Sequence, residues 1–239
     1  MAKLKAKIRL DKMISKCTGL TRSEATRALK NGYGKINNIP QKSGKVLVDL
    51  ANDEVVFDDE ILQYREQIYI MMHKPKGYVC AAKDERLKTV LELLPASLAS
   101  REPFSCGRLD IDTTGLVILT DDGTWAHGIT SPKRKCEKSY LVGSAGELSQ
   151  EDMQSLEEGL YLDEDDKITA PAKIERLGEK TYRLKITEGR YHQVKRMFES
   201  VNNMVKSLHR EQIGDLALDP ELPEGEWRDM SPEEVELFK

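Results

Sequence analysis

Three short segments of the chain carry the residue types from which a catalytic site can be assembled. The densest is Gly107–Gly115, which reads G-R-L-D-I-D-T-T-G and runs into an apolar stretch. Lys138–Val142 places Tyr140 in a strand-like pattern, and Glu188–Met197 is a glycine turn followed by a basic helix start. Together they offer a carboxylate nucleophile or base, an aromatic ring and several cations.

The Asp-rich segment is compatible with three kinds of site. As D-x-D-x-T it is similar to an aspartyl-phosphate phosphatase loop, but such a nucleophile ends an apolar strand, and here the apolar Leu116–Leu119 follows the motif. As a calcium loop it has oxygen ligands at suitable spacing up to Asp121, but its flanks lack helical patterns. The third interpretation makes Asp110 a single catalytic carboxylate beside Arg108, and an Asp110 that merely caps a turn is the structural alternative.

The other two segments supply possible partners for such a carboxylate. Tyr140 could stack on an extruded base, worth roughly 1–3 kcal/mol, or be an ordinary sheet tyrosine. His192, Lys195 and Arg196 fall within one turn of a helix start, where the backbone dipole favours an anion. Alternatively, His192 is a hydrogen-bonded turn residue and Arg196 a surface charge.

Charge is distributed unevenly along the 239 residues, although the net charge is only −4. Residues 1–45 hold twelve Lys or Arg against two acids, whereas residues 46–66 and 211–239 are strongly acidic. This separation favours a basic module that binds a polyanion. A solvated basic tail is the alternative, but the same residues follow helical patterns.

The basic region reads as two short helices. Apolar residues at Leu10, Met13, Ile14 and Cys17 predict one helix that ends at Gly19, and Thr21 with Glu24 forms a capping box for a second that runs to about Lys30. Short strands are expected near residues 35–39 and 46–50. The cations expected on the solvent side, as phosphate contacts, are Lys12, Lys16, Arg22, Arg27 and Lys30.

Two helices joined by a tight loop would also suit a DNA-reading helix-turn-helix. The sequences R-L-D-K-x-I-S at Arg9–Ser15 and T-R-S-E-A at Thr21–Ala25, followed by a strand pair, resemble the S4 RNA-binding module of ribosomal and RNA-modifying proteins. The resemblance implies an RNA-binding domain over residues 1–62.

From about Gln67 the pattern changes to strands and helices without a regular β-α repeat. Strands are predicted at 68–72, 116–120, 139–143, 172–177 and 182–187, and helices at 89–94, 150–158 and 193–200. We therefore expect an α+β fold, in which a small S4-like α/β domain precedes a larger domain, residues 67–239, with a mixed, mainly antiparallel sheet.

The three segments G-R-L-D-I-D-T-T-G-L, E-K-S-Y-L-V and E-G-R-Y-H-Q-V-K-R-M occur in this order behind the S4-like module. In this combination the chain, from about residue 6 to 235, resembles the pseudouridine synthases of the small-subunit ribosomal class. The resemblance implies that Asp110 is the catalytic aspartate and that Arg108 fills the gap left by a flipped nucleotide. It implies likewise that Tyr140 stacks on the target uracil and that Lys195 pairs with the aspartate. His73 stands where the family usually has asparagine.

The family's reaction converts a uridine in RNA to its isomer pseudouridine, which requires neither a cofactor nor a metal. The expected partner is 16S ribosomal RNA or a small-subunit assembly intermediate; a large-subunit RNA substrate and a non-catalytic S4-type binding or assembly protein are the alternatives. Whether Asp110 attacks covalently or removes a sugar proton stays open.

Other features bear on location and metal binding. The cysteines Cys17, Cys80, Cys106 and Cys136 are scattered without a C-x-x-C pair, so we expect reduced thiols and no metal site. The longest apolar stretches are far shorter than the roughly 18 residues of a spanning helix. We expect a cytoplasmic monomer that does not contact membranes.

Overall fold

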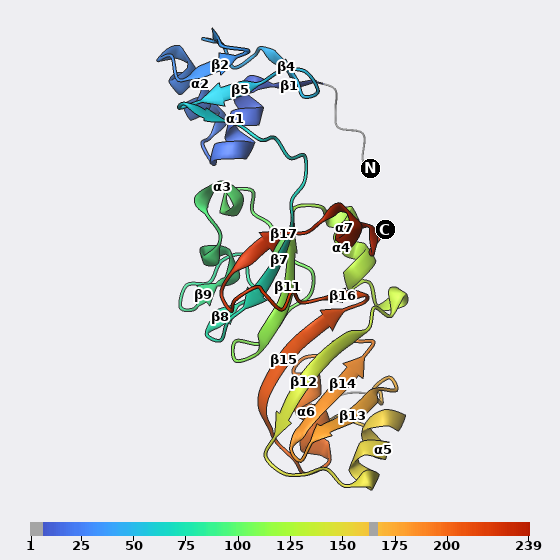
Figure 1. The fold of residues 1–239 in the computed structure, drawn as a ribbon. Helices are drawn as coiled ribbons and strands as arrows, with labels where there is room; N and C mark the ends of the chain where they lie inside the picture. Colours follow the sequence, from blue (N-terminus) through green and yellow to red (C-terminus); the bar gives the residue numbers. More distant parts are fainter. Residues whose placement is uncertain (1–6, 163–166) are drawn as a thin grey trace. The chain divides into compact units, whose positions relative to one another are not determined.

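The computed structural model describes residues 7–162 and 167–239, which divide into two units (Figure 1). The first comprises the described residues up to Ile68 together with Leu94–Pro103. The second comprises Tyr69–Leu93 and the described residues from Phe104 onward. Leu94–Pro103 belongs to the first unit although it falls inside the range 67–239, and Arg101 ties it there by donating to the carbonyls of Arg65 and Glu66.

The first unit contains two antiparallel sheets and three helices among its described residues. Its strands are β1 (Lys7–Arg9), β2 (Gly34–Ile36), β3 (Ile39–Pro40), β4 (Leu47–Asp49), β5 (Val55–Phe57) and β6 (Glu60–Ile61). Its helices are α1 (Leu10–Thr18), α2 (Arg22–Lys30) and α3 (Ala96–Ala99). β1 pairs with β4, and the other four strands follow the order β3-β2-β5-β6.

Local signals in the sequence fix the ends of α1 and α2. Gly19 adopts a left-handed conformation with φ of 82° and donates its N–H to the Ser15 carbonyl, which ends α1 as predicted. Thr21 and Glu24 form the predicted capping box at the start of α2. The apolar faces of both helices bury Leu10, Ile14 and Leu29 against β4 and β5.

The second unit is built on one large sheet with the strand order β13-β14-β12-β15-β11-β7-β17. These strands are β7 (Tyr69–Lys74), β11 (Thr114–Thr120), β12 (Lys138–Ser144), β13 (Lys173–Gly178), β14 (Thr181–Ile186), β15 (Val205–Ile213) and β17 (Trp227–Asp229). β10 (Phe104–Ser105) adds to β11 and β16 (Leu216–Ala217) to β15. β11 and β15 run parallel and the other pairs of this sheet antiparallel, so the α+β class with a mixed, mainly antiparallel sheet is confirmed.

Helices cover parts of both faces of this sheet. The α-helices of the second unit are α4 (Gly123–Thr130), α5 (Gln150–Glu158), α6 (Gln193–Ser200) and α7 (Pro232–Glu236), and η2 (Pro132–Arg134) is a 3₁₀ turn. α6 packs on one face through Phe198, whose ring meets that of Tyr182 at 6.2 Å. On the opposite face Met71 and Ile118 pack against Trp125 of α4, and α7 completes the same cluster. Among the described residues, no helix is both long and apolar enough to span a bilayer.

The helix predicted at 89–94 is wrong in its details. The chain forms the short strand β9 (Lys88–Thr89), which pairs with β8 (Tyr78–Val79), followed by the 3₁₀ helix η1 (Val90–Leu93). The Glu92 carboxylate accepts a hydrogen bond from the Thr89 N–H, which closes this tighter turn. Neither α4 nor β15 was predicted.

Candidate active site

A row of residues across the sheet supports the segment that contains Asp110. Gly115 of β11 pairs with Lys74 of β7 on one side and with Arg210 of β15 on the other, and Arg210 pairs in turn with Tyr140 of β12. Paired residues project to the same face, and Leu184 of β14 continues the row toward α6. Gly115 has φ of 107°, and a Cβ there would lie 2.3 Å from the Arg210 carbonyl oxygen, so glycine is required.

Lys74 holds the Asp110 loop by its backbone. Its side chain is fully buried, and Nζ donates to the carbonyl oxygens of Pro75, Asp110 and Thr113 at 3.0, 3.0 and 2.8 Å. These three acceptors use all three ammonium hydrogens. Burial lowers the pKa of Lys74, and the nearby Asp112 and Asp110 favour its charged form.

Arg210 holds the same loop from the other side. Its guanidinium is 1% exposed; Nε donates to the Leu116 carbonyl at 2.8 Å and Nη1 reaches the Arg108 carbonyl at 3.5 Å. Two buried cations thus bind backbone carbonyls before, within and after the loop. The conformation of the loop is therefore fixed without using the Asp110 carboxylate.

The Asp110 carboxylate contacts two side chains at the start of α6. Lys195 Nζ lies 3.1 Å from Asp110 Oδ2 and 2.6 Å from Asp112 Oδ1, and His192 Nε2 lies 3.5 Å from Asp110 Oδ1. Asp110 and Lys195 are both mostly buried, with side chains 28% and 21% exposed. An isolated carboxylate at this depth pays a desolvation cost, which an opposite charge in contact offsets.

Lys195 serves two carboxylates at once. Burial by itself lowers the pKa of Lys195, but the hydrogen bonds with Asp112 and Asp110 outweigh it and the pKa is raised. Burial likewise raises the pKa of Asp112, and the hydrogen bond from Lys195 outweighs it and lowers the pKa. Lys195 is therefore firmly protonated at neutral pH.

The loop that precedes α6 is held at several points. The buried Gln193 accepts from the Arg190 N–H at 2.9 Å and donates to Glu188 at 2.7 Å. The Arg190 guanidinium donates to the carbonyls of Lys167 and Ile168 at 2.6 Å each. His192, the residue before the helix, has φ of 48°, a left-handed conformation that is uncommon for a side chain of its size.

The remaining candidate residues of this unit lie as follows. Tyr140 is buried, 7% exposed, on the same face as Lys74 and Arg210, with β15 between its strand and β11. Arg108 is exposed, and the positive φ of Gly107 forms the bend just before it. The structure therefore places Lys195 in direct contact with Asp110, and Tyr140 on the face that carries the Asp110 loop.

The calcium-loop alternative for the Asp-rich segment disagrees with the structure. The segment leads directly into β11 rather than into a helix, which is not the arrangement of a helix–loop–helix calcium site. Within 7–162 and 167–239, no group of three or more His, Cys, Asp or Glu side chains is placed to hold a metal ion. The expectation that the flanks of this loop are not helical is wrong on one side, because α4 begins at Gly123, two residues after Asp121, but Thr114–Thr120 within the loop form β11.

A surface pocket of about 540 Å³ lies on the opposite face of the sheet. His73, Arg183 and His209 contribute to its lining, and these residues alternate along their strands with the residues that face α6. None of Asp110, Tyr140 and Lys195 lines it. His73, the departure from the family pattern, donates from Nδ1 to the Leu222 carbonyl oxygen at 2.8 Å, and its ring centroid lies 5.3 Å from that of His209.

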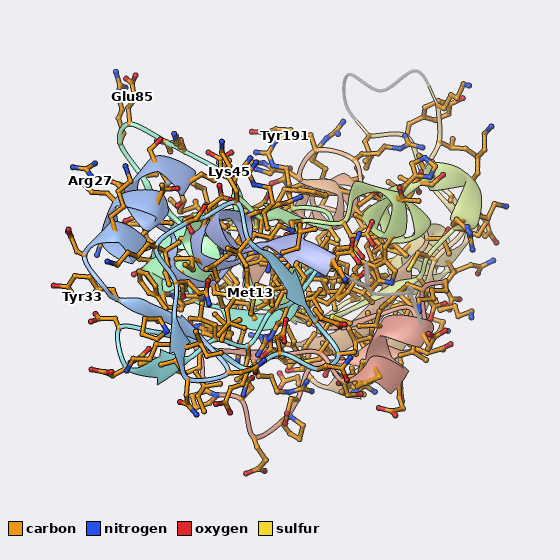
Figure 2. All side chains as sticks on the ribbon, turned by 90° about the horizontal axis from the view of Figure 1, so that it is seen from above. Met13, Arg27, Tyr33, Lys45, Glu85 and Tyr191 are labelled. Carbon is orange, nitrogen blue, oxygen red and sulfur yellow. The ribbon has the colours of Figure 1, made fainter. Side chains whose placement is uncertain are left out.

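The five cations proposed as phosphate contacts in the first unit differ in their surroundings. Lys12, Arg27 and Lys30 are exposed, and Arg27 points outward from α2 in Figure 2. Arg22 is also exposed, but its guanidinium binds the buried Asp11 at 3.0 Å together with Arg9. Lys16 is only half-exposed and donates to the Glu66 carbonyl at 2.7 Å, so its expected position on the solvent side is only partly correct.

The site also contains residues that the sequence did not indicate as functional. Lys74 belongs to a K-P-K-G turn and Arg210 to a strand with alternating charges, and both look like surface cations. Asp112 had a usable signal, the D-x-D spacing, but it was interpreted only as a possible phosphatase or calcium motif. The roles of Lys74 and Arg210 depend on their burial, which no local pattern reveals.

The mixed sheet thus presents an aspartate on a fixed loop to a lysine and a histidine, an arrangement that suits an enzyme with a catalytic carboxylate. Residues 68–200 match the sequence profile of the RNA pseudouridylate synthase family, and the chain belongs to this family. The protein is a pseudouridine synthase, as the sequence predicted.

Within this family, the chain is similar over nearly its whole length to enzymes of one named kind. The chain is 46% identical over 230 residues to ribosomal small subunit pseudouridine synthase A of Haemophilus influenzae, covering 96% of this chain and 98% of that protein. It is 40% identical over 229 residues to the protein of the same name from Escherichia coli K12, covering 95% and 98%. A crystal structure of a pseudouridylate synthase that is 45% identical matches with a TM-score of 0.70 and covers 97% of this chain and 100% of that one.

Proposed function

We propose that this protein converts one uridine of the small-subunit, 16S, ribosomal RNA to pseudouridine, with Asp110 as the catalytic carboxylate. The observation that carries the proposal is the contact of Asp110 with Lys195 and His192 on a loop held by Lys74. The names of the relatives, which align over nearly their whole length, support the small ribosomal subunit as the target.

The reaction is an isomerisation in which atoms balance. The bond between uracil N1 and sugar C1′ breaks, the ring turns, and C1′ bonds to C5. The proton on C5 leaves, and N1 takes up a proton. Asp110 acts either by attacking the sugar or the ring or by removing a sugar proton, and in each case it must be ionised.

Lys195, Tyr140 and Arg108 each have a role in this proposal. Lys195 keeps the carboxylate charged when bound RNA excludes water from the site. Tyr140 stacks on the extruded uracil, and Arg108, exposed on the same loop, fills the gap that the uracil leaves in the RNA.

We infer that the first unit is the S4-like anchor for RNA. Its exposed Lys12, Arg27 and Lys30 are the phosphate contacts, with Arg22 and Lys16 contributing more weakly because other groups already bind them. The partner is 16S RNA, naked or in an assembling subunit, and the enzyme acts as a monomer in the cytoplasm. A large-subunit RNA target remains the alternative within the same reaction.

Asp110→Asn tests the catalytic assignment. The amide keeps the shape of the side chain but not its charge, so release of tritium from RNA labelled at uridine C5 should be abolished while RNA binding persists. Asp215→Asn, an exposed aspartate in the turn between β15 and β16, is the matched control and should turn over normally. Substantial turnover by Asp110→Asn would remove Asp110 from its role.

The target is tested separately. Pseudouridine should be lost from one position of 16S RNA in cells that lack the protein and should return when the protein is restored. Loss from a large-subunit position instead would overturn the proposed target but leave the chemistry intact.

A further inference from the structure

An exposed aromatic ring lies one residue from the side chains that contact Asp110. Tyr191 is 77% exposed, and Figure 2 shows it at the periphery of the side chains. Its ring stacks on the imidazole of His192 at a centroid distance of 3.8 Å and an interplanar angle of 19°. Because His192 Nε2 lies 3.5 Å from Asp110 Oδ1, the stacked pair extends from the catalytic carboxylate toward solvent.

The backbone beneath this ring is fixed. Gln193 and Arg190 tie the loop to Glu188 and to the Lys167–Ile168 segment, as described above. The Tyr191 carbonyl accepts a hydrogen bond from Arg196 Nη1 at 3.2 Å. The ring is thus exposed on an ordered support rather than on a loose loop, so little ordering entropy is lost when a flat ligand stacks on it.

The stacking geometry leaves one face of the Tyr191 ring for a ligand, because His192 covers the other. Extruding a uridine from RNA unstacks its two neighbours as well as the uridine itself. Proteins that bind single-stranded RNA replace such lost stacking with tyrosine, phenylalanine and histidine rings. Arg196, in the first turn of α6, adds positive charge beside the Tyr191 backbone, which suits the phosphate of an adjacent nucleotide.

We propose that Tyr191, backed by His192, is a stacking platform for the base of a nucleotide directly adjacent to the target uridine. This inference rests on the proposed function, because it takes Asp110 as the point at which the target is held. It assigns a second base-binding position, distinct from that of Tyr140. Tyr191 would contribute to the recognition of substrate and to the stability of the extruded state, not to the chemical step.

The test uses the full-length protein and a 16S RNA fragment that contains the target. Tyr191→Ala should weaken binding of the fragment roughly 5- to 150-fold, the range expected for one lost base–aromatic stack. Tyr191→Phe should bind as the unchanged protein does, because the ring rather than the hydroxyl carries the effect. Tyr161→Ala removes another tyrosine of the second unit, 68% exposed, and should leave binding unchanged.

A double-mutant cycle identifies the stacked base. Fragments with an abasic site directly 5′ or directly 3′ of the target uridine are bound to the unchanged protein and to Tyr191→Ala. For one of the two fragments, the abasic site and Tyr191→Ala should each weaken binding by the same factor, and their combination should weaken it no further. The platform is refuted if the two losses of affinity multiply for both fragments. It is also refuted if Tyr191→Ala binds the fragment without an abasic site as tightly as the unchanged protein does.

The readouts separate a structural role from a binding role and this inference from the proposed function. A ring that only supports His192 would lower turnover at saturating RNA without the dependence on an abasic neighbour, and that result would overturn the platform. Normal RNA binding by Tyr191→Ala, together with inactivity of Asp110→Asn, would remove the platform and leave the function standing. Activity of Asp110→Asn would instead remove the function itself.

Discussion

Replacement of the buried Lys74 by methionine tests whether the Asp110 loop depends on a charged clamp. Methionine keeps most of the length and apolar volume of the lysine but has no donor for the carbonyls of Pro75, Asp110 and Thr113. The Asp110 carbonyl also accepts from the Thr113 N–H at 3.1 Å, so it keeps a partner after the change. The cost therefore falls on the other two carbonyls.

The expected size follows from these contacts. Each buried acceptor that loses its donor costs about 1–3 kcal/mol, so two cost about 2–6 kcal/mol. Burial of the Lys74 ammonium itself costs free energy, as the lowered pKa of Lys74 indicates, and the variant is relieved of this cost. We therefore expect Lys74→Met to lower the free energy of unfolding by about 2–4 kcal/mol, the lower half of that range.

The assay combines chemical denaturation with turnover on RNA. Lys76→Met, two residues along on the exposed part of the same turn, is the control and should be within about 0.5 kcal/mol of the unchanged protein. In the fraction of Lys74→Met that remains folded, kcat should fall by up to about 100-fold, because a small displacement of a catalytic group is enough for such a loss. Unfolding free energy and kcat both close to those of the Lys76→Met control would refute the clamp.

Two further predictions concern groups whose pKa is displaced. Asp112→Asn removes the negative charge from the 2.6 Å contact that raises the pKa of Lys195, so the alkaline limb of the kcat/KM profile should move to lower pH, whereas Asp215→Asn should leave it in place. An unmoved limb in Asp112→Asn would contradict the sharing of Lys195. Arg228 binds Glu234 at 2.7 Å, which lowers the pKa of that carboxyl below its ordinary range of about 4. The pKa of Asp219 is lowered first by the hydrogen bond from the Glu221 N–H and then by Arg228, which it contacts at 2.7 Å. Carboxyls with a lowered folded-state pKa stabilise the fold above pH of about 4 and lose this contribution as pH falls through the lowered pKa. Arg228→Gln should therefore flatten the fall in the free energy of unfolding on the acid side. An identical acid dependence in the two proteins would count against this role of Arg228.

The sequence predicted those parts of the fold that have local causes. Gly19 ends α1 because a residue there must adopt a left-handed conformation, and the pair Thr21 and Glu24 starts α2 by satisfying free amides. Strands such as β14 alternate apolar and polar residues because one face is buried. Each of these signals lies within a few residues of the element that it determines.

The missed elements have non-local causes. β15 carries His209, Arg210 and Glu211 in its interior and lacks a simple apolar alternation, because Arg210 is buried on backbone carbonyls while its neighbours line the pocket on the other face. α4 begins with a glycine after the Asp122 cap and is stabilised by the packing of Trp125 against the C-terminal residues. No pattern within either segment records those distant partners.

The candidate site shows the same contrast between local signals, which the sequence reveals, and distant contacts, which it does not. The residue types of Asp110 and Lys195 suggested a carboxylate and a cation, but they are 85 positions apart, and only the resemblance to a family joined them before the structure placed them 3.1 Å apart. The shared contact of Lys195 with Asp112 could not be predicted from spacing, because it depends on how the loop is folded over the sheet.

The groups around Asp110 divide into those that hold the backbone of its loop and those that contact its carboxylate. Lys74 and Arg210 are buried and bind only backbone carbonyls in the contacts described, so they fix the loop and add positive potential without occupying the carboxylate. Lys195 contacts the carboxylate itself, from a helix start whose dipole has the same sign, and His192 Nε2 lies 3.5 Å from the other carboxylate oxygen. When RNA covers the site and displaces water, the effective dielectric constant falls and all of these attractions strengthen. The attraction between Lys195 and the Asp110 carboxylate should therefore be greatest in the complex with RNA, which is the state in which the proposed function requires an ionised Asp110.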